Sequence, residues 1–436
     1  MWLPDLGVVS GYGPRCGGRR SPVLVRRSRD MIVQQSPSPA RRHPRSCVPF
    51  GVAGYQGTVA SHPAPVFLRA VGTAVPVTVL RQAAFRDVLA AQPALGRLGA
   101  RRLRAVFDAS EIDTRHTVLG ELGGELGDGE GGGEPVHYDA RTGTVLTPTT
   151  GVRNAAYARE APGLFLAAAK DALSGADLVP DDVTHVVTVS CTGFFAPGPD
   201  YLLVRQLGLP VTTQRFHLGF MGCYGAFPGL RLAHAVCRAD PDAVVLVVCA
   251  ELCSLHLHVA DDVDTVLSSS LFADGAAAAV VTGRAPGAGT GSVTLDTLGT
   301  TLSDDGEADM AWTIGDQGFD MVLSRWVPRI LGSSLPGAVP ALLGPVRPAE
   351  VDRWAVHPGG RSVLDQVQTA LGLSDEHLAP SRDVLRRYGN MSSPTVLFVL
   401  AQLLRAPAAS AERLAALAFG PGLTVESALL TRTPAA

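Results

Sequence analysis

Eight consecutive apolar residues, Ala243 to Ala250, end at Glu251. A run of this length is typical of a strand that is covered on both faces of its sheet. It is far shorter than the ~20 apolar residues that a bilayer span needs, and the chain holds no longer run. The run therefore predicts a buried strand and argues against an integral membrane protein.

Further strands and helices alternate along the chain. Strand-like runs lie at 65–71, 185–191, 276–281, 354–356 and 423–430. Apolar residues recur at helical spacing in 87–107, 163–174, 225–238, 361–371 and 393–405. The Gly- and Glu-rich stretch 120–134 reads as an exposed acidic loop. Strands that alternate with helices predict an α/β protein with largely parallel sheets.

Composition divides the 436 residues into a tail and two lobes. Residues 1–63 hold nine Arg against two Asp, whereas the whole chain has a net charge of −3. This segment is rich in Pro, Ser and Gly and has no apolar period, so we predict a disordered tail, with Met31 as an alternative start. A basic arm for an anionic partner is the functional alternative. The Pro- and Gly-rich stretch 284–291 separates the expected lobes, 64–285 and 286–436.

Several classes of protein are excluded by the same composition. Seven Cys are too few for a disulfide scaffold, and 46% hydrophobic residues are too many for a disordered chain. Outside the tail no basic patch predicts a nucleic-acid partner. No apolar signal segment precedes the lobes, so we expect a cytoplasmic protein with reduced thiols.

Cys223 is the strongest candidate for a nucleophile. It lies directly before the predicted helix 225–238, where the positive end of the helix dipole favours a thiolate. Gly222 and Gly225 flank it and permit a tight turn and the close approach of a ligand. A buried structural thiol is the alternative, as we expect for Cys237 and Cys249.

His357 and Asn390 also lie at strand-to-helix junctions. His357 follows the strand 354–356, at the type of position where sites form in α/β sheets. Asn390 precedes the helix 393–405, where helix capping is the alternative to a functional role. If a Cys, a His and an Asn converge, the thiolate can attack a thioester while two side-chain donors hold the oxyanion.

Six motifs occur in the order seen in type III polyketide synthases, the chalcone and stilbene synthase family, which the chain resembles from about residue 65 to 431. The motifs are Phe220-Met-Gly-Cys-Tyr-Gly-Ala226, Glu251-Leu-Cys-Ser-Leu255, Leu271-Phe-Ala-Asp-Gly275, Val356-His-Pro-Gly-Gly360, Gly389-Asn-Met-Ser-Ser393 and Phe419-Gly-Pro-Gly-Leu-Thr424.

The resemblance implies a thiolase fold, a layered αβαβα arrangement of two pseudo-duplicated halves, in a homodimer. It implies an acyltransferase of secondary metabolism in which Cys223 takes a starter acyl group from coenzyme A. His357 is expected to pair with the thiolate as an imidazolium, and with Asn390 to assist decarboxylation of malonyl-CoA. Repeated condensation and cyclisation follow. The partners are malonyl-CoA and acyl-CoA, with no metal and no cofactor.

The resemblance also implies a substrate pocket. Phe272 matches a gatekeeper Phe, although a core Phe at a strand start is the alternative, and Met321 takes the place of a second gatekeeper. Cys191 and His256 stand where plant enzymes have Thr, and Trp312 where chalcone synthase has Gly. Two further pocket residues come from the last two motifs: Ser392 and Pro421.

Arg102 and Ser362 are expected to bind coenzyme A. Two other basic positions of the family are Ala105 and Ala109 here, and Arg101 and Arg104 are candidates to compensate. Because the pocket departs from the plant pattern, we expect a pyrone, a resorcinol or a related phenol rather than a chalcone.

Two alternatives remain open. A β-ketoacyl synthase of the third type shares the fold and the Cys, His and Asn set, but it condenses once and uses an acyl carrier protein. A non-catalytic thiolase-fold protein would explain the altered pocket and the lost basic residues.

Overall fold

The computed structural model describes residues 64–123, 134–303 and 305–435. Within them nine strands form one large sheet: β1 (Phe67–Ala74), β6 (His185–Ser190), β7 (Gln214–Gly219), β8 (Val244–Leu252), β9 (Asp274–Thr282), β10 (Ser292–Leu302), β13 (Arg353–Val356), β14 (Glu412–Gly420) and β15 (Thr424–Thr433). Their spatial order is β13-β14-β15-β10-β1-β9-β8-β6-β7. The predicted tail 1–63 and most of the predicted acidic loop lie outside the described residues.

Three strand pairs complete the β structure: β2 (Thr78–Arg81) with β3 (Thr114–Thr117), β4 (Tyr138–Asp139) with β5 (Thr144–Val145), and β11 (Met310–Gly315) with β12 (Gly318–Leu323). The α-helices of the described chain are α1 (Gln82–Ala90), α2 (Arg97–Asp108), α4 (Thr150–Ala176), α5 (Pro199–Leu207), α6 (Ala226–Ala239), α7 (Val263–Leu271), α8 (Val327–Leu343), α9 (Arg361–Leu371), α10 (Asp375–Tyr388) and α11 (Thr395–Arg405).

The strand order repeats within the large sheet. In one half β1 is antiparallel to β9, β9 is antiparallel to β8, and β8 is parallel to β6. In the other half β10 is antiparallel to β15, β15 is antiparallel to β14, and β14 is parallel to β13. A single residue pair, Phe67 with Thr294, joins the halves between β1 and β10. The two halves therefore share one topology.

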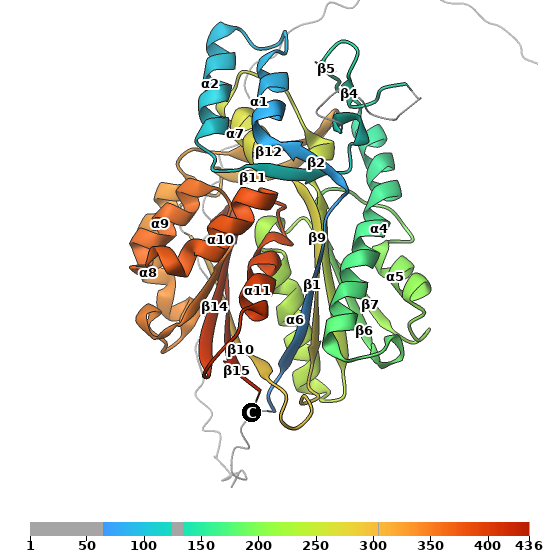
Figure 1. Ribbon diagram of the computed structural model, residues 1–436, viewed down its shortest axis with the longest axis vertical. Coiled ribbons are helices and arrows are strands. Elements are labelled where there is room, and N and C mark those ends of the chain that lie inside the picture. The colour runs from blue at the N-terminus through green and yellow to red at the C-terminus, as the bar shows by residue number, and fades with distance from the viewer. Residues whose placement is uncertain (1–63, 124–133, 304, 436) are drawn as a thin grey trace, which may run out of the picture. The chain divides into compact units, whose positions relative to one another are not determined.

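Helices cover the two halves in layers (Figure 1). Helix α4 packs on β1, β8 and β9, helices α6 and α11 contact strands of both halves, and α8 and α10 pack on β10, β15 and β13. This layered αβαβα arrangement is the thiolase fold, as predicted. The division at residues 285 and 286 stays a prediction.

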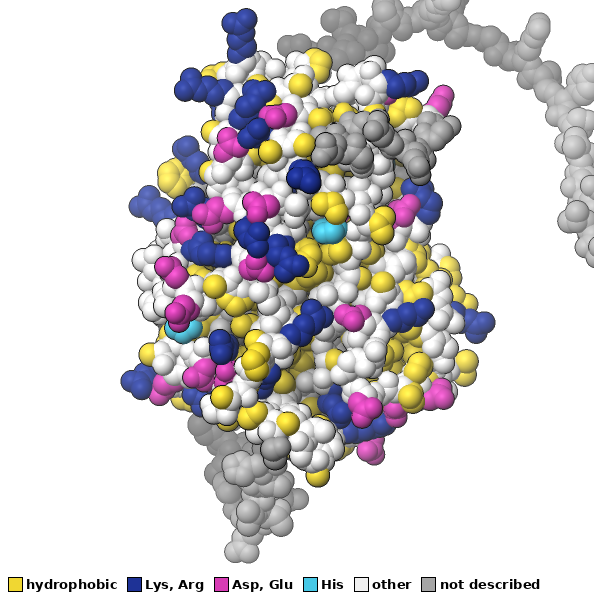
Figure 2. All heavy atoms as spheres, in the orientation of Figure 1, with side chains coloured by type: hydrophobic (Ala, Val, Ile, Leu, Met, Phe, Trp, Pro, Cys, Tyr) yellow, Lys and Arg dark blue, Asp and Glu magenta, His cyan; other side chains and the backbone are white. Residues whose placement is uncertain are grey.

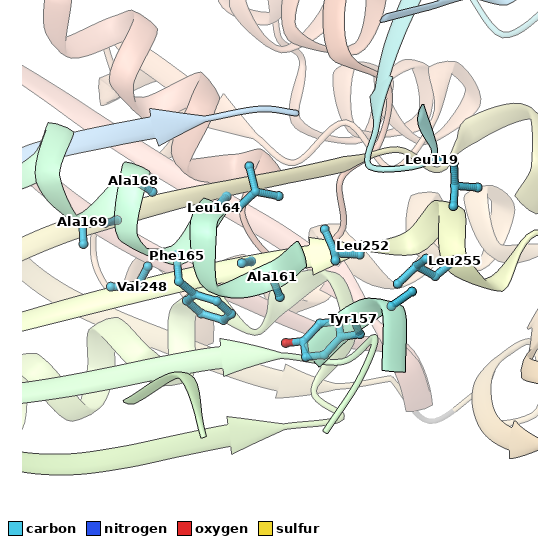
Figure 3. Close-up of a cluster of buried hydrophobic side chains, with 14 of the residues drawn as sticks. Leu119, Tyr157, Ala161, Leu164, Phe165, Ala168, Ala169, Val248, Leu252 and Leu255 are labelled. Atoms are coloured by element: carbon cyan, nitrogen blue, oxygen red, sulfur yellow. The ribbon is translucent and has the colours of Figure 1, made fainter. Parts of the chain in front are cut away.

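Small residues let helix α4 lie close to the sheet (Figure 3). Ala161, Ala168 and Ala172 are fully buried on its inner face. A Cβ atom at Gly72 of β1 would lie 2.2 Å from the backbone nitrogen of Ala172, so the helix and the strand touch through their backbones. Helix α4 thus packs directly on β1, and it also contacts β8 and β9.

Three sequence predictions differ from the structure. The expectation of a largely parallel sheet is wrong: five of the eight strand pairs in the large sheet are antiparallel, because short connections such as Pro421–Leu423 join successive strands as hairpins. The predicted helix 87–107 is two helices, because Pro93 cannot donate a backbone hydrogen bond and the chain turns between Ala91 and Gly96. The predicted helix 163–174 is the second half of the longer helix α4. None of the described helices is long and apolar enough to cross a lipid bilayer.

Candidate active site

Cys223 is presented by a tight turn. The turn η3 (Gly222–Tyr224) lies between β7 and α6, and Gly222 has a φ of +73°. A Cβ atom at Gly222 would lie 2.4 Å from Cδ of Pro421, so only glycine fits here. The turn therefore holds the Cys223 thiol at the amino-terminal end of α6, as the sequence predicts.

Asn390 lies beside this thiol. Its side-chain oxygen and nitrogen are each 4.0 Å from Sγ of Cys223. Its Oδ1 also accepts a hydrogen bond from the backbone N–H of Ser392 at 2.8 Å, and its Nδ2 donates to the carbonyl of Gly359 at 3.3 Å. These bonds fix the orientation of the amide. The capping alternative is wrong, because Pro394 is the N-cap residue of α11.

His357 follows β13 directly and is almost completely buried. Its backbone N–H donates to the carbonyl of Leu417 at 2.8 Å. Neither ring nitrogen has a hydrogen-bond partner among the described residues. Both nitrogens are therefore available to a substrate or to the thiol.

Burial disfavours the charged forms of both side chains, the Cys223 thiolate and the His357 imidazolium. It raises the pKa of the Cys223 thiol to about 11, although hydrogen bonds from Ser392 and Asn390 act in the opposite direction. Burial also lowers the pKa of His357 to about 3. Burial alone therefore favours a neutral thiol and a neutral imidazole, and the predicted ion pair depends on the mutual attraction of its two charges.

A cavity of about 190 Å³ brings these three side chains together. Six of the seven predicted pocket residues line the same cavity: Cys191, Phe272, Trp312, Met321, Ser392 and Pro421. Ser362, which was predicted to bind coenzyme A, also lines it. Seven predicted positions from six separate segments thus line the cavity that holds the thiol. His256 and Arg102 do not line this cavity.

His256 lies in the wall of a second cavity, of about 400 Å³, which shares Cys253, Phe272, Trp312 and Met321 with the first. Its Nε2 lies 2.7 Å from the carbonyl oxygen of Thr192, and its Nδ1 accepts from the backbone N–H of Phe319 at 3.1 Å. With both nitrogens in use and its ring stacked on Phe319, His256 is held rigidly.

Arg102 lies on the surface of α2, outside both cavities. Its guanidinium contacts Oδ1 of Asp261 at 3.1 Å and the Asp261 carbonyl at 3.2 Å. Figure 2 shows several basic side chains over the region of α1 and α2, in keeping with the Arg-rich sequence of α2. Coenzyme A binding by Arg102 stays a prediction.

Two family comparisons cover most of the chain. Residues 56–286 match the N-terminal domain of chalcone and stilbene synthases, and residues 297–434 match the C-terminal domain. The chain belongs to the chalcone and stilbene synthase family. It is therefore a type III polyketide synthase, an acyltransferase-type enzyme of a family that uses malonyl-CoA and acyl-CoA. The β-ketoacyl synthase alternative is not favoured.

Named relatives span bacteria and plants. The chain is 36% identical over 272 residues to the alpha-pyrone synthesis polyketide synthase-like Pks18 of Mycobacterium tuberculosis, covering 60% of this chain and 68% of the relative. It is 35% identical over 286 residues to the bisdemethoxycurcumin synthase of Oryza sativa subsp. japonica, covering 62% of this chain and 71% of the relative.

Solved structures of type III polyketide synthases share the fold. The tetrahydroxynaphthalene synthase of Streptomyces coelicolor superposes with a TM-score of 0.73 at 27% identity, covering 85% of this chain and all of that chain. PKS-I of the brown alga Ectocarpus siliculosus superposes with a TM-score of 0.77 at 28% identity, covering 85% of this chain and 99% of that chain.

Glu251 is a structural residue of this type III polyketide synthase. It belongs to one of the six family motifs, but the sequence alone indicated no role for it. Glu251 is the penultimate residue of β8 and is fully buried, and burial raises its pKa to about 7. One carboxylate oxygen accepts from the Cys191 backbone N–H and the Thr192 hydroxyl, both at 2.8 Å, and the other accepts from the Ser393 hydroxyl at 2.6 Å. Glu251 therefore ties the Cys191 segment to the Asn390 segment.

Further cavity residues of the synthase were also missed. Cys253 and Arg325 line the catalytic cavity, and the sequence analysis assigned neither. Cys253 lies within the motif Glu251-Leu-Cys-Ser-Leu255, which could have indicated it, whereas Arg325 lies in none of the six motifs. Among the described residues, no group of three or more His, Cys, Asp and Glu side chains is arranged to hold a metal ion.

Proposed function

We propose that Cys223 carries the growing chain of this polyketide synthase. The thiolate attacks the carbonyl of an acyl-CoA, the C–S bond to coenzyme A breaks, and coenzyme A leaves as its thiolate. The observation that supports this role is the convergence of Cys223, His357 and Asn390 in one cavity with mainly apolar walls. Such a cavity excludes water that would hydrolyse the thioester.

In the next step malonyl-CoA loses its carboxylate as CO₂ and becomes an enolate. The enolate carbon attacks the thioester carbonyl on Cys223, a carbon–carbon bond forms, and the Cys223 thiolate leaves. Donors aimed at the developing oxyanion stabilise such a step. The Nδ2 group of Asn390 lies 4.0 Å from the sulfur, and the His357 ring, which lines the same cavity, offers a second donor. Neither His357 nitrogen has a competing partner among the described residues.

We propose an α-pyrone or a related small phenol as the product. Two observations support this product. Trp312 occupies the wall between the two cavities, which limits the space next to Cys223. The mycobacterial relative carries α-pyrone synthesis in its name. Within this proposal the enzyme works as a cytoplasmic homodimer and needs no cofactor besides its substrates, and the exposed edge strand β7 is a candidate for pairing with a second copy.

Product analysis by mass spectrometry tests the proposal. Purified protein receives malonyl-CoA alone and with a panel of acyl-CoA starters, beside the Cys223→Ala variant. We expect pyrones or phenols from the wild type and none from the variant. Products that form only with malonate on a carrier protein would instead identify a single-condensation ketosynthase. No acylation of Cys223 under any condition would favour a non-catalytic protein.

A further inference from the structure

The catalytic cavity, which holds Cys223, opens to solvent beside the first residues of α8 and α9. Among the described residues that line this cavity, Arg325 and Ser362 are exposed, whereas the others are buried or half-buried. Arg325 directly precedes Trp326, the N-cap residue of α8, and Ser362 lies in the first turn of α9. A substrate that reaches the Cys223 thiol from solvent therefore passes this mouth.

Arg325 is a cation at this mouth that no described carboxylate neutralises. Its guanidinium forms no ion pair or hydrogen bond within the described part of the chain, whereas Nε of Arg361, the residue before Ser362, lies 3.2 Å from a carboxylate oxygen of Glu111. Asp309 accepts a backbone hydrogen bond from Ser324 at 2.9 Å, but its carboxylate does not pair with Arg325. The charge of Arg325 is thus available to an anionic ligand.

The guanidinium of Arg325 is oriented by Trp326. Its central carbon lies 4.8 Å from the centroid of the Trp326 ring, and 48% of Trp326 is exposed, so the pair lies at the surface. A guanidinium that stacks on a ring keeps its N–H groups in its own plane, where they can form two parallel bonds to a phosphate. Holding the side chain in place beforehand also lowers the entropy lost on binding.

The basic positions that the family pattern places at α2 are poorly suited to bind phosphate in this chain. Two of them are Ala105 and Ala109. The third, Arg102, is already paired with Oδ1 of Asp261 at 3.1 Å. None of the residues of α2, all of which the structure describes, lines the catalytic cavity. A charged group at the mouth therefore has Arg325 beside it rather than α2.

We propose that Arg325 binds the phosphate groups of the coenzyme A thioesters, and that it takes this role in place of the α2 positions. The inference rests on the proposed function of Cys223, because the thioester must enter the cavity to reach the thiol. Phosphate groups are costly to bury and stay in water at the mouth. Leu323 and Val363, next to the mouth in the cavity lining, suit the uncharged pantetheine arm.

Thioesters with and without phosphate groups test the inference. Arg325→Gln removes one exposed charge, so we expect it to raise the KM for malonyl-CoA about fivefold and to leave kcat nearly unchanged. Malonyl-N-acetylcysteamine has the same thioester without phosphate, and its KM should not rise. An equal rise with both substrates, or no rise with malonyl-CoA, would overturn the inference.

A third thioester identifies which phosphate Arg325 contacts. Malonyl-dephospho-CoA keeps the diphosphate and lacks the 3′-phosphate. If the effect of Arg325→Gln persists with this substrate, Arg325 binds the diphosphate, and if it disappears, Arg325 binds the 3′-phosphate; both results support the inference. The KM for malonyl-CoA should also rise with salt more steeply in the wild type than in Arg325→Gln, because salt screens exposed charges. Identical salt dependence would contradict a phosphate contact.

Arg329→Gln is the matched control. Arg329 is exposed and lies in the first turn of α8, but it does not line the cavity. The variant loses the same charge and should leave the KM for malonyl-CoA unchanged. An equal rise in this control would show a general effect of net charge and would overturn the role of Arg325. A larger rise in Arg102→Gln than in Arg325→Gln would return that role to α2.

Acylation of Cys223, followed by intact-protein mass spectrometry, separates the two proposals. If neither hexanoyl-CoA nor hexanoyl-N-acetylcysteamine loads Cys223, the proposed function fails. If limiting hexanoyl-CoA loads the wild type and Arg325→Gln equally fast, the proposed function stands and only the role of Arg325 is wrong. We expect slower loading of Arg325→Gln by hexanoyl-CoA and equal loading of both proteins by hexanoyl-N-acetylcysteamine.

Discussion

The indole Nε1–H of Trp312 donates a hydrogen bond of 3.0 Å to the carbonyl oxygen of Cys191. The sulfur of Cys191 in turn accepts from the backbone N–H of Gly222, at 3.0 Å, in the turn that carries the proposed nucleophile. The wall between the two cavities is thus bonded to the residue that supports the Cys223 turn. The ring of Trp312 also meets Phe319 edge-on, with centroids 5.7 Å apart.

Replacing Trp312 by glycine should lengthen the polyketide products. In Trp312→Gly the side chain that lines both cavities is lost, so we expect the cavities to merge and the enzyme to add one or more further malonyl units. Loss of the ring and of its hydrogen bond should lower the free energy of unfolding by roughly 3 kcal/mol. Product masses from malonyl-CoA and one fixed starter provide the measurement.

Trp312→Phe serves as the control for this change, because it keeps a ring in the wall and loses only the bond to Cys191. Its products should match those of the wild type in length. An unchanged product profile in Trp312→Gly would show that Trp312 does not limit the chain.

Substitution of His357 should change both turnover and thiol reactivity. His357→Gln keeps one donor but cannot become a cation, so we expect kcat to fall by about 10²–10³-fold. Burial raises the pKa of Cys223 to about 11 and an adjacent imidazolium would lower it. The rate of alkylation by iodoacetamide, followed against pH, should therefore have a lower midpoint in the wild type than in His357→Gln. Superimposable profiles would exclude the ion pair.

Local pattern marked the three proposed catalytic residues as candidates, because each stands at a junction that the chain marks clearly, but their roles came from the resemblance to the family. Cys223 lies between two glycines before a helix, and His357 follows a buried strand. The role of Asn390 was less evident, since Ser and Asn before a helix also predict a cap. Only the structure shows its amide bonded to Ser392 and Gly359 instead.

Contacts between distant segments could not be predicted in this way. The helix pattern at 87–107 hides a break at Pro93, and α8 contains Pro336 and Pro340, which usually end helices. Arg115 looks like an ordinary charged residue of a short strand. Its burial depends on α7 and on the rings of Phe85 and Phe107, and no local spacing indicates these.

Glu251 should make stability depend on pH. Its carboxyl pKa is raised from 4.5 to about 7 in the folded chain, so between these values the folded state binds more protons than the unfolded state. The stabilisation is complete below pH 4.5 and is lost as pH rises through 7, an effect of about 3 kcal/mol. Chemical unfolding at several pH values provides the measurement. Between pH 4.5 and 7 the free energy of unfolding of the wild type should fall relative to that of Glu251→Gln. Asp274, whose pKa burial raises to about 6, contributes equally to both proteins. If the free energies of unfolding of the two proteins changed in parallel with pH, the raised pKa of Glu251 would be contradicted.

The backbone of the nucleophile turn should tolerate no side chain at Gly222. An added methyl would meet Pro421 at 2.4 Å, and the φ of +73° disfavours any residue with a Cβ atom. We therefore expect Gly222→Ala to displace Cys223 and to reduce product formation by at least tenfold, roughly the effect of an ångström-scale misplacement.

The control for Gly222→Ala is Gly163→Ala, on the exposed side of α4, where a Cβ atom would meet nothing within 4 Å. This change should raise the free energy of unfolding by about 0.5–1 kcal/mol and leave turnover unaltered. Circular dichroism should show a folded Gly222→Ala protein, because the turn is short and the core lies elsewhere. Full activity in folded Gly222→Ala would mean that the position of the Cys223 thiol does not depend on this contact with Pro421.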